Sequence, residues 1–272
     1  MRLSMNSALW ALQCLAADSL HILKAPAGSK LELLSGLYSF GSKRAGFNIR
    51  HPNARTVYQL YREIFARQCY YFPSQSNAPL IFDCGANVGA ATMYFKWLCP
   101  HARIHAFEAD PQTLILLQRN IAENRLTDIT PHHCALWDND GDIDFFFDAD
   151  RPSELSMSTD GSYFSGQCVK VPARRLSEFI NEQIDFLKMD IEGAEHRVLT
   201  DLVSSGKISF IRRMTIEYHH RIGSKSSDLG DFLKALEQAG FEYQIDASLF
   251  PGHRNDTFQS IFLVCYRPDQ FV

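Results

Sequence analysis

The fold of this 272-residue chain is decided by residues 80–89, which read Leu80-Ile81-Phe82-Asp83-Cys84-Gly85-Ala86-Asn87-Val88-Gly89. The opening apolar run is typical of a short buried strand, and an acid and two glycines follow where the strand ends. Glycine allows a tight turn and a close approach of backbone to ligand. In α/β folds, ligands bind where such a strand leads into a helix. The stretch therefore predicts the first strand, turn and helix of an α/β ligand-binding sheet.

Outward from this stretch, short apolar runs alternate with longer amphipathic ones. The expected strands are Leu80–Phe82, Arg103–Phe107, Ile129–Cys134, Ile184–Met189, Ile211–Tyr218, Phe241–Ile245 and Phe258–Tyr266. The expected helices are Val88–Leu98, Pro111–Asn124, Ala194–Leu202 and Asp228–Gln238. Such alternation is typical of a parallel sheet covered by helices on both faces. Because no helix precedes the last strand, that strand is expected to run antiparallel in a seven-stranded, mostly parallel sheet.

Two regions lie outside this alternation. Between the third and fourth strands, Ile143–Phe147 and Cys168–Val171 are expected to form a β insertion around a serine-rich segment without periodicity. Residues 1–79 are expected to form a helical extension, and residues 80–272 the sheet domain.

The extension is expected to contain helices over Asn6–Lys24 and Thr56–Tyr70, where apolar residues recur at helical spacing. Together with the serine-rich segment, it is expected to cover the pocket of an acceptor substrate. The alternatives for the extension are packing on the edge of the sheet and a homodimer interface.

The overall composition narrows the classes of partner and compartment. Hydrophobic residues make up 46% and charged residues 21%, as in ordinary globular proteins. The formal net charge of −4 argues against nucleic acid as the main partner, since proteins that bind phosphates are usually basic. Seven dispersed cysteines indicate free thiols in a reducing compartment. No apolar run is long enough to cross a membrane. These observations predict a cytoplasmic protein without a membrane partner.

The glycine turn indicates a nucleoside cofactor without phosphates. The dinucleotide fingerprint G-x-G-x-x-G would fall on Gly85, Asn87 and Ala90, so the second glycine, which admits a pyrophosphate, is missing. Glu108 ends the next strand, 19 residues beyond Gly89, where an acid binds the two hydroxyls of a ribose. S-adenosylmethionine is the common nucleoside of this kind, and its net positive charge suits a pocket that contains acids.

Three motifs in order resemble a known family. They are Asp83-x-Gly85-Ala86-Asn87-x-Gly89, Phe107-Glu108-Ala109-Asp110-Pro111 and Leu187-Lys188-Met189-Asp190-Ile191-Glu192-Gly193-Ala194-Glu195. They resemble the FkbM family of S-adenosylmethionine-dependent methyltransferases, named for an O-methyltransferase of macrolide biosynthesis. The resemblance spans roughly residues 47–264 and implies the Rossmann-like class I methyltransferase fold.

The resemblance also implies a set of cofactor-binding residues at the strand ends. The methionine end of the cofactor would be surrounded by Asp83, Gly85, Ala86, Asn87 and Gly89. The ribose would be held by Glu108, and the adenine would lie among Ala109, Cys134 and Ala135. Asp190 and Glu192 would face the reacting centre, with Asp190 also near the cofactor amine. The alternative for these two acids is capping of the helix that follows.

The fifth strand ends in Glu217-Tyr218-His219-His220 and supplies a candidate base. Methylation of a hydroxyl requires that its proton leave, and histidine, with an ordinary pKa of about 6.5, is a natural general base. His219 is therefore predicted as a catalytic base, with Glu217 orienting it or binding acceptor hydroxyls. No metal is expected, because the spacing of Asp190, Glu192 and His219 does not require one.

Taken together, these patterns predict methyl transfer from S-adenosylmethionine to a hydroxyl of a small molecule, such as a natural product or a sugar. Two alternatives remain at this point. One is N-methylation of a peptide or amide, and the other is a catalytically silent, cofactor-binding regulatory module.

Overall fold

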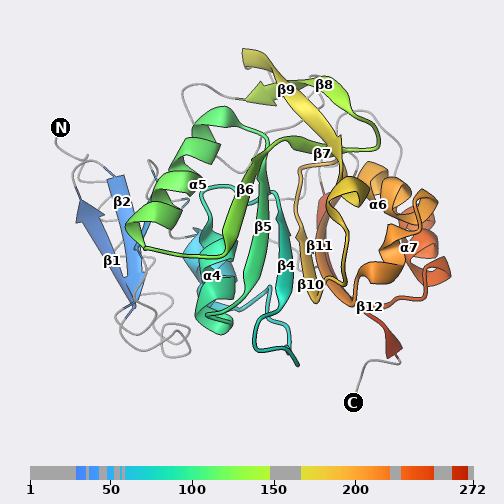
Figure 1. The fold of residues 1–272 in the computed structure, drawn as a ribbon, viewed down its shortest axis with the longest axis horizontal. Coiled ribbons are helices and arrows are strands. Elements are labelled where there is room, and N and C mark those ends of the chain that lie inside the picture. Colours follow the sequence, from blue (N-terminus) through green and yellow to red (C-terminus); the bar gives the residue numbers. More distant parts are fainter. Residues whose placement is uncertain are drawn as a thin grey trace.

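The computed structural model describes residues 29–34, 37–42, 48–51, 56, 59–147, 167–220, 228–247 and 259–268 (Figure 1). Its central sheet contains β4 (Leu80–Cys84), β5 (Arg103–Glu108), β6 (Ile129–His133), β10 (Phe186–Met189), β11 (Arg213–His220), β12 (Glu242–Asp246) and β13 (Gln259–Tyr266). Its helices are α4 (Ala90–Leu98), α5 (Pro111–Glu123), α6 (Glu195–Ser204) and α7 (Leu229–Gln238). Each of these elements coincides, within a few residues, with one expected from the sequence.

The strand order is β12-β13-β11-β10-β4-β5-β6. From β4 the chain moves outward to β5 and β6, then returns to add β10 on the other side of β4. The strands from β6 to β11 pair in parallel, whereas β13 runs antiparallel to both of its neighbours, β11 and β12. The seven-stranded sheet with an antiparallel last strand is thereby confirmed. The reversal between β4 and β10 creates the switch point at which such sheets bind ligands.

Both faces of the sheet are buried, which explains why its strands read as continuous apolar runs. All five residues of β4 are buried, and their side chains alternate between two cores. Phe82 packs in the core that contains Val198 of α6 and Phe232 of α7. Ile81 packs in the opposite core, which contains Met93 of α4. The two cores fix β4 firmly beneath the glycine turn.

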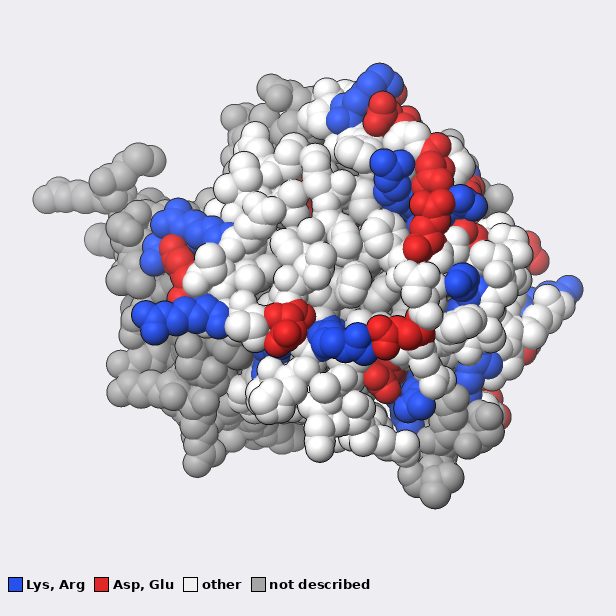
Figure 2. Space-filling model, viewed as in Figure 1, with Lys and Arg blue, Asp and Glu red and all other residues white. Residues whose placement is uncertain are grey.

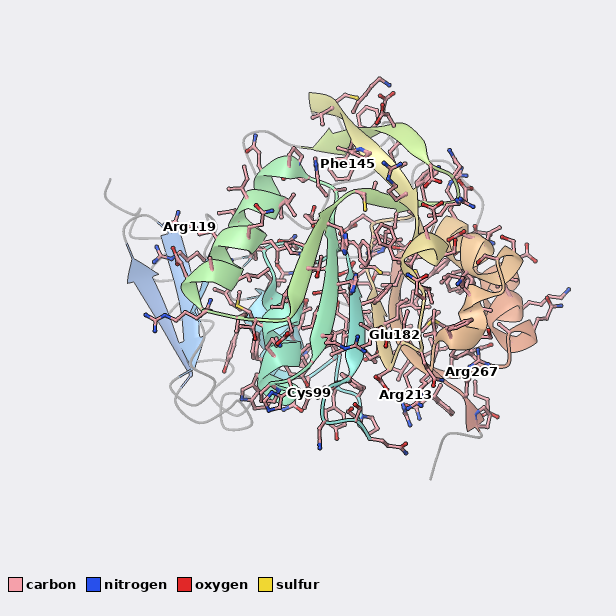
Figure 3. The ribbon with its side chains drawn as sticks, viewed as in Figure 1. Cys99, Arg119, Phe145, Glu182, Arg213 and Arg267 are labelled. Carbon is pink, nitrogen blue, oxygen red and sulfur yellow. The ribbon has the colours of Figure 1, made fainter. Side chains whose placement is uncertain are left out.

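The expected β insertion is present and contains one strand more than expected. Strand β8 (Gly141–Phe147) pairs antiparallel with β9 (Gln167–Arg175), and β7 (Ala135–Trp137) joins β9 in parallel. Phe145 of the insertion lies at the opposite end of the molecule from Arg213, at the start of β11 (Figure 3). The insertion is thus on the carboxyl side of β11. The serine-rich segment lies outside the described residues.

The prediction of a helical extension is wrong for much of its described part. Strands β1 (Ser29–Leu34), β2 (Leu37–Ser42) and β3 (Asn48–His51) form an antiparallel sheet. The run Lys30-Leu31-Glu32-Leu33 alternates polar and apolar residues, which is the strand period. The expected helix Asn6–Lys24 lies outside the described residues.

Within the second expected helix, a π-helix, η1 (Tyr61–Ala66), is found. It does not continue past Arg67, since Gln68 takes a left-handed φ of 56°. The extension is anchored to the sheet domain through β3, where Asn120 of α5 accepts a hydrogen bond from the Arg50 amide at 3.0 Å. Arg50 also pairs with Glu123. The extension thus docks on α5 by backbone and charge.

Surface and thiol features accord with the composition. Within the described ranges, no helix combines the length and apolarity that crossing a bilayer requires. The six cysteines described are free thiols. On the face shown in Figure 2, basic and acidic side chains lie side by side around a broad uncharged area.

Candidate active site

The candidate site lies at the carboxyl ends of β4, β5, β10 and β11, around the switch point. Its first component is the contact between the turns that follow β4 and β10. Gly85 has a φ of 78°, and a Cβ added to it would lie 1.8 Å from the backbone oxygen of Asp190. The Asp190 amide in turn donates to the Cys84 carbonyl at 3.1 Å. Only glycine can occupy position 85, because the two turns touch through backbone alone.

The glycine turn offers no amide cradle for a phosphate. The amides of Gly85 and Ala86 both donate to the Phe107 carbonyl, at 3.0 and 2.8 Å. The Val88 amide donates to the Asn87 side chain, and the Gly89 amide to the Ala86 carbonyl. The remaining amide, of Asn87, donates to Glu108. A phosphate site needs several amides directed at the ligand, so this turn fits a cofactor without phosphates.

Glu108 is held rigidly at the end of β5. One carboxylate oxygen accepts the Asn87 amide and the other accepts the Asp110 amide, each at 2.8 Å. Burial raises the pKa of Glu108 to about 7, although these two amides oppose the shift. Each oxygen keeps a second lone pair, so the carboxylate can accept two ribose hydroxyls without leaving its backbone partners. Its position fits the predicted ribose acid.

Replacing Glu108 by alanine is expected to weaken S-adenosylmethionine binding about 100-fold. Charge-assisted hydrogen bonds contribute about 1.5–3 kcal/mol each, and tenfold in affinity corresponds to about 1.4 kcal/mol. In the wild type, affinity should rise between pH 6 and pH 8, because ribose hydroxyls donate to the ionised form of a carboxyl whose pKa is about 7. Calorimetry measures both effects. Glu182→Ala, which removes an exposed acid paired with Arg103, is the control and should bind normally. Equal affinities for wild type and Glu108→Ala would refute the ribose assignment.

Ala109 and Ala135, predicted beside the adenine, are brought together as expected. They pack in one small cluster with Phe145 and Val171 of the insertion. Cys134 is buried in the main core, and burial raises the pKa of its thiol to about 12. Cys134 therefore contributes apolar packing and no thiolate.

Asp83 is fully buried beneath the turn, where it supports the loop by charge. Its Oδ2 accepts the Thr92 hydroxyl at 2.6 Å, and its Oδ1 lies 3.5 Å from the Lys188 ammonium. Lys188 donates to the carbonyls of Cys84 and Gly85 and lies 3.5 Å from Asp190. Burial lowers the pKa of Lys188, but Asp190 and Asp83 outweigh burial and raise it above its ordinary value. Lys188 is thus a buried cation that ties the two turns together.

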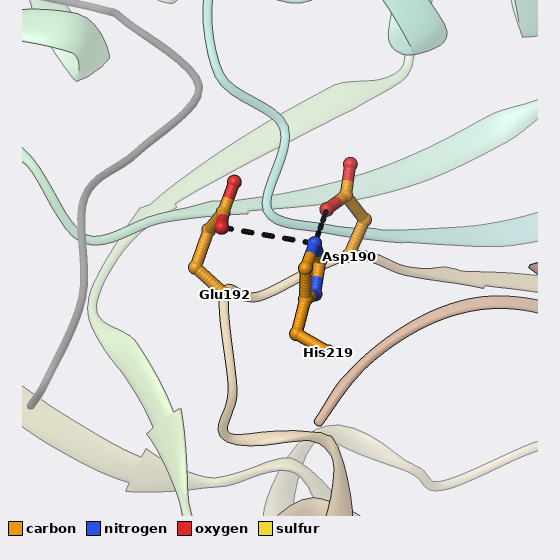
Figure 4. A group of neighbouring side chains, drawn as sticks. All are labelled: Asp190, Glu192 and His219. Carbon is orange, nitrogen blue, oxygen red and sulfur yellow. Dashed lines mark ion pairs between the residues drawn. The ribbon is translucent and has the colours of Figure 1, made fainter. Parts of the chain in front are cut away.

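His219 of β11 is surrounded by acids (Figure 4). Its Nδ1 lies 3.0 Å from Glu195, and its Nε2 lies 3.7 Å from both Glu192 and Glu217 and 4.0 Å from Asp190. Burial lowers the pKa of His219, but these carboxylates hold it well above its ordinary value. The structure thus brings all four predicted catalytic residues together, with the histidine enclosed at their centre.

The helix-capping alternative falls on a different acid, Glu195. Its Oε1 accepts the amides of Ile191 and Gly193 at 3.2 and 3.1 Å, at the start of α6. Asp190 and Glu192 are therefore not occupied with capping and face the reacting centre. Glu217 lies beside them, and its Oε1 accepts the Ser260 hydroxyl at 2.6 Å. Burial and the charge of Asp190 raise the pKa of Glu217 to about 7.

The extension also reaches the site. The Tyr70 hydroxyl donates to Asp190 at 3.4 Å, and its ring lies 5.6 Å from the Lys188 ammonium. Glu63 of η1 lies close enough for Asp190 to contribute to its raised pKa, for which burial is the larger cause. The predicted cover is thus realised in part, by residues other than those expected. Of the aromatic residues expected there, Tyr61 is described, and it packs in the α4 core.

Three site residues were not singled out from the sequence: Lys188, Glu195 and Tyr70. Lys188 had a signal, because a lysine between buried residues of a strand requires partners. Glu195 could have been found as a first-turn acid of the helix. Tyr70 had no signal, since nothing local brings it to a residue 120 positions away.

The sheet order, the phosphate-free turn and the ribose acid define the class: a Rossmann-like methyltransferase that uses S-adenosylmethionine. The model of the methyltransferase FkbM domain matches residues 83–243, more than half of the chain, and the chain belongs to this family. The resemblance noted in the sequence is thereby confirmed.

Curated relatives and a solved structure agree with this membership. The chain is 29% identical over 229 residues to 31-O-demethyl-FK506 methyltransferase FkbM of Streptomyces tacrolimicus, covering 72% of this chain and 86% of the relative. It is 29% identical to Methyltransferase 1 of Beauveria bassiana over 164 residues, covering 53% of this chain and 66% of the relative. The structure of methyltransferase FkbM from Methylobacillus flagellatus aligns with a TM-score of 0.47 at 17% identity, covering 93% of this chain and 60% of that one.

Proposed function

We propose that this methyltransferase methylates a hydroxyl oxygen of a small molecule, in a natural product or a sugar. The observation that carries the proposal is the group of acids opposite the cofactor residues, Asp190, Glu192 and Glu217, which suits hydrogen bonding to acceptor hydroxyls. The name of the Streptomyces relative, which specifies an oxygen, supports the same choice. The acidic net charge and dispersed cysteines support a cytoplasmic enzyme that acts on small molecules rather than nucleic acid.

S-adenosylmethionine, when bound, supplies a methyl group activated by its sulfonium, and the methyl passes in line to the acceptor oxygen as the carbon–sulfur bond breaks. The Gly85 turn and Glu108 orient the cofactor side. Asp190 and Glu192 orient the acceptor. The fixed positions of these groups supply proximity and alignment, which carry much of the rate in such transfers.

We assign the proton of the acceptor hydroxyl to Glu217 rather than to His219. His219 is 6% exposed, and both of its ring nitrogens face carboxylates. The Glu217 side chain is 23% exposed, and its Oε2 accepts no hydrogen bond from the described residues. A general base must reach the proton that it removes, and Glu217 has this access.

The experiment that tests the function is turnover with methyl-labelled S-adenosylmethionine in metabolite extracts, followed by identification of the labelled product. An O-methyl product and formation of S-adenosylhomocysteine are expected. Label on nitrogen would instead identify an N-methyltransferase. Cofactor binding without any turnover would identify a regulatory module and refute the proposal.

Once an acceptor is known, Glu217→Gln is expected to lower kcat by about 10²- to 10⁴-fold, the usual contribution of a general base. The Kd for S-adenosylmethionine should not change, because Glu217 lies on the acceptor side. Glu242→Gln on exposed β12 is the matched control and should retain full activity. Unchanged kcat in Glu217→Gln would show that alignment alone carries the reaction.

A further inference from the structure

Three side chains of different chemistry converge at the ends of β10 and β11. Asp190, Glu192 and His219 each present one ligand atom, and these atoms all lie within 4.8 Å of one another. In Figure 4 the Nε2 side of the imidazole is directed at both carboxylates. Its distances are 4.0 Å to Asp190 Oδ1 and 3.7 Å to Glu192 Oε2.

We propose that Asp190, Glu192 and His219 bind a divalent cation on the acceptor side of the site. The sequence alone had favoured no metal. Two carboxylates and one imidazole form a mixed oxygen and nitrogen donor set, which suits cations such as Mn²⁺.

The orientation of His219 supports this assignment independently of the acids. Its Nδ1 lies 3.0 Å from Glu195, and the amides of Ile191 and Gly193 hold that carboxylate in place. A histidine that binds a metal usually donates its other ring N–H to a carboxylate, which fixes the tautomer and directs the remaining nitrogen at the ion. His219 has this arrangement, with Nε2 facing the two remaining ligands.

The dimensions also fit one ion. Ligand atoms about 2.1 Å from a cation are at most about 4.2 Å apart. The two distances from His219 Nε2, 3.7 and 4.0 Å, already fall within this limit. Small side-chain rotations would complete the coordination. Glu217, whose Oε1 is 3.7 Å from the same nitrogen, lies beside the site without being needed as a ligand.

The charge balance favours a cation here. The carboxylates that face His219 belong to Asp190, Glu192, Glu195 and Glu217, and Asp83 lies beyond Asp190. Within the described part of the chain, the cationic partner facing these acids besides His219 is Lys188. The single net positive charge of S-adenosylmethionine does not neutralise the remainder. Buried charges require compensation, and a divalent ion supplies it.

The ion also narrows the class of acceptor, a step that rests on the proposed function. A cation held by three protein atoms keeps open positions for ligands from the substrate. An acceptor with two neighbouring oxygens, such as a vicinal diol, would occupy two of these positions and place one oxygen toward the methyl group. Polyhydroxylated acceptors are therefore favoured over isolated alcohols.

The test is titration of the full chain, stripped of metal by a chelator, with Mn²⁺, followed by calorimetry and electron paramagnetic resonance. One Mn²⁺ per chain is expected. Glu192→Gln and His219→Ala should each weaken binding at least tenfold. Asp142→Asn, which removes an exposed acid from the acidic turn before β8, is the control and should bind as wild type does. Circular dichroism confirms that each variant is folded, and Glu192→Gln keeps the test valid if His219→Ala does not fold.

Absence of Mn²⁺ binding at millimolar concentration would overturn the inference, and the space would then hold only a proton on Nε2. Binding that survives both substitutions would also overturn it. S-adenosylmethionine binding, measured in the same chelated protein, separates this failure from that of the proposed function. Cofactor binding without Mn²⁺ binding refutes only the cation site. Mn²⁺ binding without cofactor binding supports the cation site and counts against the proposed function.

Discussion

Replacing Gly85 by alanine is expected to abolish measurable binding of S-adenosylmethionine and to destabilise the fold by more than about 4 kcal/mol. Position 85 has a φ of 78°, and the added methyl would lie 1.8 Å from the Asp190 carbonyl oxygen. Neither partner is a side chain that can rotate away. The turns after β4 and β10 would have to separate, and both sides of the candidate site would move apart. Calorimetry with S-adenosylmethionine and thermal unfolding measure the two effects.

Gly206→Ala is the matched control for this substitution. Gly206 has a similar φ of 73°, but an added Cβ there meets nothing within 4 Å. This variant should lose only the cost of a left-handed alanine, about 1–2 kcal/mol, and should bind the cofactor normally. The difference between the variants measures the contact between the two turns. If both variants were equally stable and bound the cofactor equally well, that contact would have no role.

Replacing Lys188 by methionine is expected to destabilise the protein by about 3–5 kcal/mol, because removing one partner of a buried ion pair leaves the other charge uncompensated. Lys188 is 3% exposed, and Asp83, 3.5 Å away, is fully buried. The substitution also removes the hydrogen bonds to the Cys84 and Gly85 carbonyls. Urea unfolding measures the loss, and weaker cofactor binding should accompany it.

The double variant Asp83→Asn with Lys188→Met tests the cause. It should recover part of the lost stability, since no unpaired carboxylate remains. Lys170→Met, which breaks an exposed pair with Asp144, should cost less than about 1 kcal/mol. A Lys188→Met variant as stable as Lys170→Met would show that Lys188 does not hold the turns together.

The sheet was predictable because its signals are local. Each strand from β4 to β13 of the central sheet is a short apolar run, and each helix carries apolar residues at helical spacing, so the order of elements could be read along the chain. The β1–β3 sheet was missed although its alternation is visible, because its strands are only four to six residues long. Short segments give weak periodic signals.

For the candidate site, the sequence by itself determined the residues that sit at strand ends. Gly85, Glu108 and Asp190 could be assigned because the carboxyl ends of parallel strands meet at one edge of a sheet. The missing second glycine also predicted a turn without a phosphate cradle, and the structure explains it by engaging every amide from Gly85 to Gly89 within the protein.

Only the tertiary structure decided how these residues are paired. Glu195, rather than Glu192, caps α6 and orients His219, and Lys188 rather than solvent neutralises Asp83. Tyr70 reaches Asp190 because the extension folds back over the sheet. The sequence pattern records which face or end of an element a residue occupies. The charge that a buried group carries depends on the distances to its neighbours, and folding sets those distances between residues that are remote along the chain.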